Sequence, residues 1–132
     1  MTQIGAILLV DSEEVSVNQL KPFLESQGYP VTCASKGKDA LEYFRSHTVS
    51  FMIIDTSLMD MSGLELIWQV KGIDPDCPLL VTSKDPSGEA EIQAREAGIL
   101  YYARKPYNIE HILSVIKRSL QKQTKMSDVQ VQ

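Results

Sequence analysis

The sequence of 132 residues is poor in the features that mark several large classes of protein. It has only two cysteines, Cys33 and Cys77, with no export signal before them, so we expect both to remain reduced, small apolar side chains in a cytoplasmic protein. No apolar run reaches the roughly 18 residues that a membrane-spanning helix needs, so no membrane contact is expected. Lys and Arg number 13 against 17 Asp and Glu, a net charge of −4, which argues against direct nucleic-acid binding by this domain.

The loops that bind nucleotides are missing as well. The first apolar run is followed by Asp11-Ser12-Glu13-Glu14, which contains no glycine, so neither a Walker A loop nor a dinucleotide-binding fingerprint is present. Phosphatase-like folds that use an Asp at a strand end typically have a second Asp two residues later, and this chain has Ser57 at that distance from Asp55. We therefore do not expect an independent enzyme.

The apolar residues, 43% of the chain, form an alternating pattern that predicts one packed domain. Short continuous apolar runs occur at 4–10, 31–34, 51–54, 79–81 and 99–103, and each is typical of a strand buried on both faces. Segments whose apolar residues have helical spacing lie between these runs or after the last of them, at 17–24, 41–44, 64–70, 86–97 and 109–120. Five alternations of this kind predict a doubly wound α/β fold, a five-stranded parallel sheet with five helices on its two faces.

Three segments fit this pattern less well. Pro22 lies inside the first helical pattern, where it predicts a kink or a late helix start. The segment 86–97 has only Ile92 and three alanines to bury, so we expect it to be the most weakly docked and most mobile helix. Residues 1–121 are predicted to form the domain, and residues 122–132, polar and without pattern, to be a tail or the start of a linker to an output domain.

Polar residues stand where the predicted strands end. Asp11 follows the first strand, Asp55 the third and Thr82 the fourth, and the fifth leads to Lys105-Pro106. Because ligands of such sheets bind beyond the carboxyl ends of the strands, we expect these side chains to share one cleft. A carboxylate can attack phosphorus, Mg²⁺ offsets the charge, and Lys and Thr contact phosphate oxygens. The set therefore favours phosphoryl transfer.

In these residues the sequence resembles the receiver domain of two-component response regulators, over about residues 4–120. The strand order of that family, flavodoxin-like 2-1-3-4-5, is implied by the resemblance. Four landmarks in the family's order and spacing carry it: Ile7-Leu8-Leu9-Val10-Asp11; Met52-Ile53-Ile54-Asp55 with Met61 and Gly63; Leu80-Val81-Thr82-Ser83; and Tyr102-Ala103-Arg104-Lys105-Pro106.

The resemblance implies a role for each matching residue. Asp55 corresponds to the phospho-acceptor, which takes a phosphoryl group from a histidine kinase, a phosphotransfer protein or a small acyl phosphate. Thr82 binds that group and shifts when it arrives, Lys105 pairs with it through a loop with a cis peptide bond to Pro106, and Tyr102 is the aromatic switch that turns inward. The fourth helix, fifth strand and fifth helix then form the face that reports phosphorylation and in this family supports homodimers.

The metal site departs from the family pattern. The resemblance implies Mg²⁺ bound by Asp11, Asp55 and the backbone carbonyl of Ser57, with a second acid after the first strand, but Ser12 stands at that acid's position. A hydroxyl is a weaker Mg²⁺ ligand than a carboxylate, so we expect weakened binding at this position. Glu13 or Glu14 could reach inward in its place, but their backbone positions are expected to direct them elsewhere.

Other departures lie in the loops around the cleft. Met59 replaces a proline and Ser62 a common Asp, which loosens or reshapes the loop after Asp55. Lys84 is either a solvated lysine or a source of positive charge for the pocket. Two functions therefore stay open: a phosphorylation switch with Mg²⁺, or a pseudo-receiver that keeps the fold and binds partners without phosphotransfer.

Overall fold

The computed structural model describes the backbone of residues 5–131 and the side chains of residues 5–123. Its strands form one parallel sheet of order β2-β1-β3-β4-β5, as predicted. They are β1 (Ala6–Val10), β2 (Val31–Ala34), β3 (Val49–Asp55), β4 (Leu79–Ser83) and β5 (Tyr101–Arg104). The helices are α1 (Glu14–Ser26), α2 (Gly37–Ser46), α3 (Gly63–Ile73), α4 (Gly88–Glu96) and α5 (Ile109–Val131).

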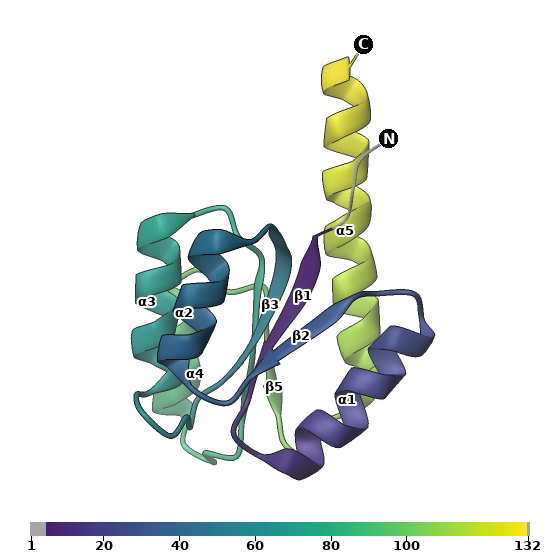
Figure 1. Ribbon diagram of the computed structural model, residues 1–132. Coiled ribbons are helices and arrows are strands. Elements are labelled where there is room, and N and C mark those ends of the chain that lie inside the picture. The colour runs from purple at the N-terminus through teal and green to yellow at the C-terminus, as the bar shows by residue number, and fades with distance from the viewer. Residues whose placement is uncertain (1–4, 132) are drawn as a thin grey trace.

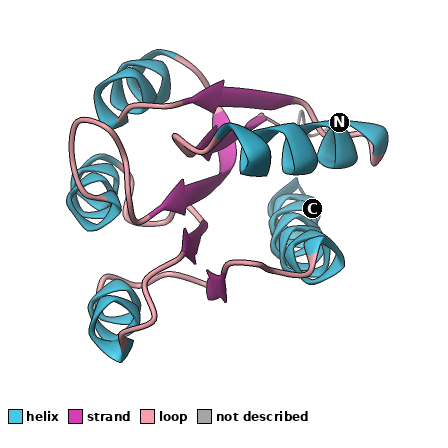
Figure 2. Ribbon diagram, turned by 90° about the horizontal axis from the view of Figure 1, so that it is seen from below, coloured by secondary structure: helices cyan, strands magenta, loops and turns pink. Residues whose placement is uncertain are grey.

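Helices cover both faces of the sheet (Figure 2). The central strand β1 is apolar at every position because alternate side chains enter different cores: Leu8 and Val10 pack with α2, α3 and α4, whereas Ile7 and Leu9 pack with α1 and α5. This arrangement confirms the interpretation of the short apolar runs as strands buried on both faces, and it brings the carboxyl ends of β1, β3 and β4 side by side.

The helices differ from the sequence predictions in detail. α1 begins at Glu14 and continues through Pro22, so the late start is wrong; the proline removes one backbone donor within the helix. In α4 only Ala94 is buried, and Ile92 is 60% exposed, so the prediction that Ile92 packs into the core is wrong. The rotation of α4 about its axis that turns Ala94 inward leaves Ile92 outside. A hydrogen-bonded ion pair of 3.2 Å between Arg104 of β5 and Glu91 links α4 to the sheet.

α5 is longer than its apolar stripe. The stripe ends at Leu120, but the helix continues through Val131, beyond the amino ends of the strands (Figure 1). No glycine or proline interrupts residues 121–131, so nothing local stops the helix where a polar, unpatterned segment was expected. Gln132 lies outside the described residues.

Two further expectations concern the thiols and the membrane. Cys33 and Cys77 are both free, and burial raises the pKa of the Cys77 thiol to about 12, which leaves it protonated and unreactive. Among the described residues, no helix has the length and apolar character needed to cross a membrane.

Candidate functional site

Asp11, Asp55 and Lys105 meet at the carboxyl edge of the sheet. β1 and β3 are neighbours in register, so the residues that follow Val10 and Ile54 stand next to each other. The Lys105 ammonium, on the loop after β5, lies 2.9 Å from Asp11 Oδ2 and 3.0 Å from Asp55 Oδ1. All three side chains are almost completely buried. The prediction that these residues share one cleft is confirmed for them.

Burial and hydrogen bonds act in opposite directions on the pKa values of Asp11 and Lys105. Burial raises the pKa of Asp11, although the hydrogen bond from Lys105 acts in the opposite direction. Burial alone would lower the pKa of Lys105, but its hydrogen bonds with Asp11 and Asp55 outweigh that effect and raise it. The ammonium therefore remains protonated and supplies a fixed positive charge beside Asp55.

Thr82 and Tyr102 lie on β4 and β5, the two strands that follow β3 in the sheet. The Thr82 hydroxyl donates a hydrogen bond of 2.9 Å to Asp55 Oδ1, and the two residues are register partners in β3 and β4. Tyr102 is 6% exposed, packs in the core under α4, and its hydroxyl is a buried polar atom without a partner among the described side chains. The Tyr102 ring is thus turned inward, and the Thr82 hydroxyl contacts the unmodified Asp55 carboxylate.

The donors around Asp55 fit a weakly bound Mg²⁺. The two carboxylates of Asp11 and Asp55 and the Ser57 carbonyl are oxygen ligands, and Mg²⁺ in proteins is commonly held by one or two carboxylates together with phosphate oxygens and waters. Ser12 differs from an acid in more than charge: its hydroxyl donates a 3.1 Å hydrogen bond to the Ser57 carbonyl oxygen. The hydroxyl therefore occupies one lone pair of a prospective ligand.

Glu13 is the site residue whose position the sequence did not predict. Its carboxylate folds back toward the cleft, where Oε1 lies 3.6 Å from Lys105 Nζ and accepts a 2.7 Å hydrogen bond from the Ser16 hydroxyl. Oε2 pairs with Lys84. The expectation that Glu13 points elsewhere is wrong, because residue 13 is the extended N-cap of α1 and its long side chain turns back toward Lys105.

Lys84 forms its ion pair with the Glu13 carboxylate and not with the Asp55 carboxylate. The hydrogen bond from Lys84 is the main reason that the pKa of Glu13 falls to about 2, with smaller contributions from Ser16 and Lys105. The Lys84 side chain is 69% exposed, so this ion pair lies at the surface of the cleft. The lysine thus neutralises the Glu13 carboxylate at the mouth of the cleft.

The loop after Asp55 is anchored at both ends. The Asp60 carboxylate accepts hydrogen bonds from the first two N–H groups of α2, those of Gly37 at 2.8 Å and Lys38 at 3.0 Å. The Ser62 hydroxyl caps α3, and the Gly63 N–H donates to the Thr56 carbonyl. These bonds fix a loop that the loss of proline was expected to loosen.

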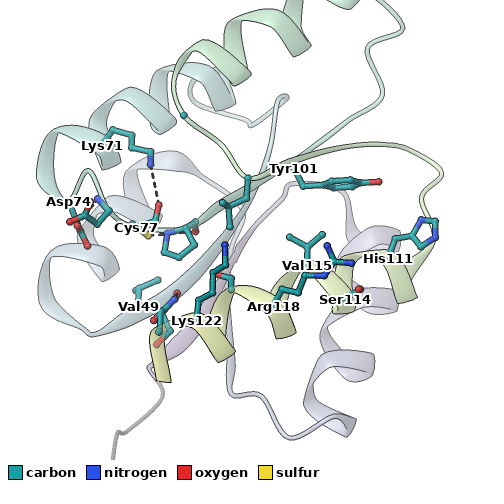
Figure 3. A pocket seen from close by; sticks show the side chains of 17 residues that line it. Val49, Lys71, Asp74, Cys77, Tyr101, His111, Ser114, Val115, Arg118 and Lys122 are labelled. Carbon is teal, nitrogen blue, oxygen red and sulfur yellow. Dashed lines mark hydrogen bonds between the residues drawn. The ribbon is translucent and has the colours of Figure 1, made fainter. Parts of the chain in front are cut away.

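A cavity of about 880 Å³ lies away from this cluster (Figure 3). Its lining includes Val49 at the start of β3, Cys77 just before β4 and Leu100 just before β5, so it opens at the amino ends of the strands, against α5. Its Lys71 ammonium already donates to the Cys77 carbonyl at 3.3 Å. None of the three residues of the Asp11, Asp55 and Lys105 cluster lines this cavity, so the two are separate.

Comparison with known proteins agrees with the geometry. The family model for the response regulator receiver domain matches residues 7–117. The transcriptional regulatory protein ZraR of Escherichia coli strain K12 is 27% identical over 114 residues, which are 86% of this chain and 26% of that protein. The uncharacterized transcriptional regulatory protein YkoG of Bacillus subtilis is 30% identical over 126 residues, 95% of this chain and 55% of that protein. This chain thus spans between a quarter and about half of these relatives.

Solved structures show the same fold. A CheY-like response regulator receiver domain protein from Methanospirillum hungatei superimposes with a TM-score of 0.87 at 27% identity, over 94% of this chain and 99% of that one. A response regulator protein from Burkholderia pseudomallei, solved with a phosphorylated aspartic acid, a calcium ion and citrate, gives a TM-score of 0.78 at 30% identity, over 92% of this chain and 72% of that one.

Proposed function

This chain belongs to the family of response regulator receiver domains, the signalling switches of two-component systems, and from that premise we propose that Asp55 accepts a phosphoryl group with the help of Mg²⁺. The donor is a histidine kinase, a phosphotransfer protein or a small acyl phosphate. The contacts of Asp55 with Lys105 and Thr82 are the observation that carries the proposal, because they provide a cation and a hydroxyl donor at the acceptor carboxylate.

The chemistry is a displacement at phosphorus. An Asp55 carboxylate oxygen forms the new P–O bond while the bond from phosphorus to the donor breaks, and the donor leaves with that electron pair. Lys105 stays close enough to balance charge that develops on the phosphoryl oxygens, and Thr82 can transfer its hydrogen bond from Asp55 to one of them. Bound Mg²⁺ supplies further positive charge, through Asp11, Asp55 and the Ser57 carbonyl. In a second displacement, water attacks the phosphorus, the P–O bond to Asp55 breaks and inorganic phosphate leaves, so Asp55 returns to its carboxylate and the domain is reset.

The signal passes from Thr82 to the face formed by α4, β5 and α5. Tyr102 lies on β5 beside Thr82's strand, and Arg104 of the same strand binds Glu91 of α4, so a shift of Thr82 has a short route to that face. We propose that this face supports a homodimer. The relatives are longer transcriptional regulators, which supports an output domain connected through α5. The pseudo-receiver alternative has the Ser12 substitution in its favour, but the intact contacts of Asp55 support the switch instead.

Mass spectrometry of the intact protein tests the proposal. The chain is incubated with acetyl phosphate and Mg²⁺, and its mass is compared with that of Asp55→Asn treated in the same way. We expect one phosphoryl group per chain in the wild type and none in the variant. No adduct at high Mg²⁺ would make the domain a pseudo-receiver, and an adduct that persists in Asp55→Asn would place the acceptor elsewhere.

A further inference from the structure

Glu13 lies at the mouth of the phospho-acceptor cleft, and no step of the proposed reaction uses it. Its Oε1 is 3.6 Å from the Lys105 ammonium, which in turn contacts Asp11 at 2.9 Å and Asp55 at 3.0 Å. Three carboxylates thus surround one ammonium. Two of them are prospective Mg²⁺ ligands, whereas the third has no function assigned to it.

The cleft lacks the acid that would complete a three-carboxylate metal site. Ser12 stands at that acid's position, and its hydroxyl donates a hydrogen bond to the Ser57 carbonyl. We infer that Glu13 is the third acid of this site: its carboxylate, already at the mouth of the cleft, leaves Lys84 and binds the divalent cation that Ser12 cannot hold. This inference rests on the proposed function, since it concerns the Mg²⁺ of the same site.

The backbone places Glu13 within reach. The Glu13 N–H donates a 2.9 Å hydrogen bond to Asp11 Oδ1, so the main chain of the one residue is fixed beside the carboxylate of the other. Only rotations about the Glu13 side chain are then needed to carry its carboxylate across Asp11. Among the described residues no three acidic, His or Cys side chains are close enough to hold a metal as they stand, which is why this rotation is part of the inference.

Lys84 opposes that rotation. It pairs with Glu13 Oε2 from the β4–α4 side, while Ser16 of α1 holds Oε1. Because the Lys84 side chain is 69% exposed, water competes with this ion pair, and the pair can open at little cost. Lys84 and the cation therefore compete for one carboxylate, and removing the lysine should favour the cation.

Isothermal titration of Mg²⁺ into the full chain, without a phosphoryl donor, measures this competition. The variants are Glu13→Gln, Lys84→Gln and the double variant. Glu14→Gln and Lys117→Gln, which change the charge equally at exposed positions, are the matched controls. We expect Glu13→Gln to weaken Mg²⁺ binding about tenfold and Lys84→Gln to tighten it about threefold, while the controls stay within about twofold.

The double variant separates direct binding from general electrostatics. If Glu13 is a ligand, Lys84→Gln has no effect once Glu13 is gone, and the double variant binds Mg²⁺ as weakly as Glu13→Gln. If Lys84→Gln tightens binding equally in both backgrounds, Lys84 acts only through its charge and the inference is overturned. It is also overturned if Glu13→Gln binds Mg²⁺ as tightly as the wild type or no more weakly than Glu14→Gln.

A rescue variant guards against misfolding. Ser12→Asp in the Glu13→Gln background restores a third acid, so it should recover the wild-type affinity for Mg²⁺ or a higher one. Failure to recover would overturn the inference that Glu13 takes the place of the acid missing at position 12. The outcome is independent of phosphorylation. A wild type that forms the Asp55 adduct while Glu13→Gln leaves Mg²⁺ affinity unchanged contradicts only the role of Glu13. A Glu13-dependent Mg²⁺ site without any adduct contradicts only the proposed function.

Discussion

Gly63 and Gly72 provide a paired test of how α3 is seated against the phospho-acceptor strand. Both belong to α3, but a Cβ added at Gly63 would lie 2.8 Å from the Thr56 Cα and closer still to the Asp55 carbonyl oxygen, whereas a Cβ at Gly72 meets nothing within 4 Å. Ordinary van der Waals contact begins at 3.4 Å, so Gly63→Ala forces backbone atoms apart by at least 0.6 Å. The Gly63 N–H bond to the Thr56 carbonyl resists that movement.

The two alanines should therefore have opposite effects. We expect Gly63→Ala to lower the free energy of unfolding by about 2 to 3 kcal/mol, the upper part of the range for an overpacked interior site, because the clash is with backbone atoms. Gly72→Ala should raise it by about 0.5 to 1 kcal/mol, because alanine costs less conformational entropy in a helix. At about 4 °C per kcal/mol for a domain of this size, Tm falls by about 8 to 12 °C in the first variant and rises by about 2 to 4 °C in the second.

Thermal unfolding followed by circular dichroism measures both shifts in one buffer without Mg²⁺. Since the same displacement moves Asp55 against Thr82, we also expect Gly63→Ala to slow acetyl phosphate labelling tenfold or more. The reasoning is refuted if Gly63→Ala unfolds at or above the temperature of Gly72→Ala, because the close approach of α3 to the Asp55 backbone would then have no effect on the free energy of unfolding.

Three further substitutions test other parts of the site. Tyr102→Phe removes a buried hydroxyl without a partner and should stabilise the domain by about 1 kcal/mol in thermal unfolding; a loss of stability would mean that the hydroxyl is hydrogen-bonded in solution. Asp60→Asn should lower Tm at neutral pH. Because the backbone N–H bonds from α2 hold the pKa of Asp60 below its usual value of 3.8, the difference from wild type should persist above that pH and vanish as the pH falls through the lower folded value; a Tm difference that does not change with pH contradicts this. Ser12→Asp should bind Mg²⁺ about tenfold more tightly in calorimetry, and unchanged affinity would contradict the account of that position.

The sheet and the cluster of polar residues at its carboxyl edge were predictable because the sequence patterns that indicate them are local. Continuous apolar runs exist where a strand is buried on both faces, and Ile7 and Leu8 of β1 indeed pack into different cores. Asp11 and Asp55 were predicted to meet because adjacent parallel strands end at one edge of the sheet. These inferences need only strand periodicity and the topology of a doubly wound fold.

The errors arose where a side chain is directed by partners far along the chain or by helix phase. Ile92 was expected in the core because it is apolar, yet the rotation of α4 buries Ala94 instead. Glu13 turns into the cleft because Lys105 and Lys84, both remote in sequence, attract it. The length of α5 was underestimated because the apolar stripe ends before the helix does. Periodicity marks which face is buried, and it gives no information about charged contacts or about helix beyond the core.

Phosphorus NMR of the chain with acetyl phosphate tests the central claim most directly. The account predicts an acyl phosphate resonance from the protein in the presence of Mg²⁺, its loss when the metal is chelated, and its absence in Asp55→Asn. A protein that gives no such resonance at saturating Mg²⁺, or one whose resonance survives in Asp55→Asn, contradicts the assignment of Asp55 as a metal-assisted phospho-acceptor.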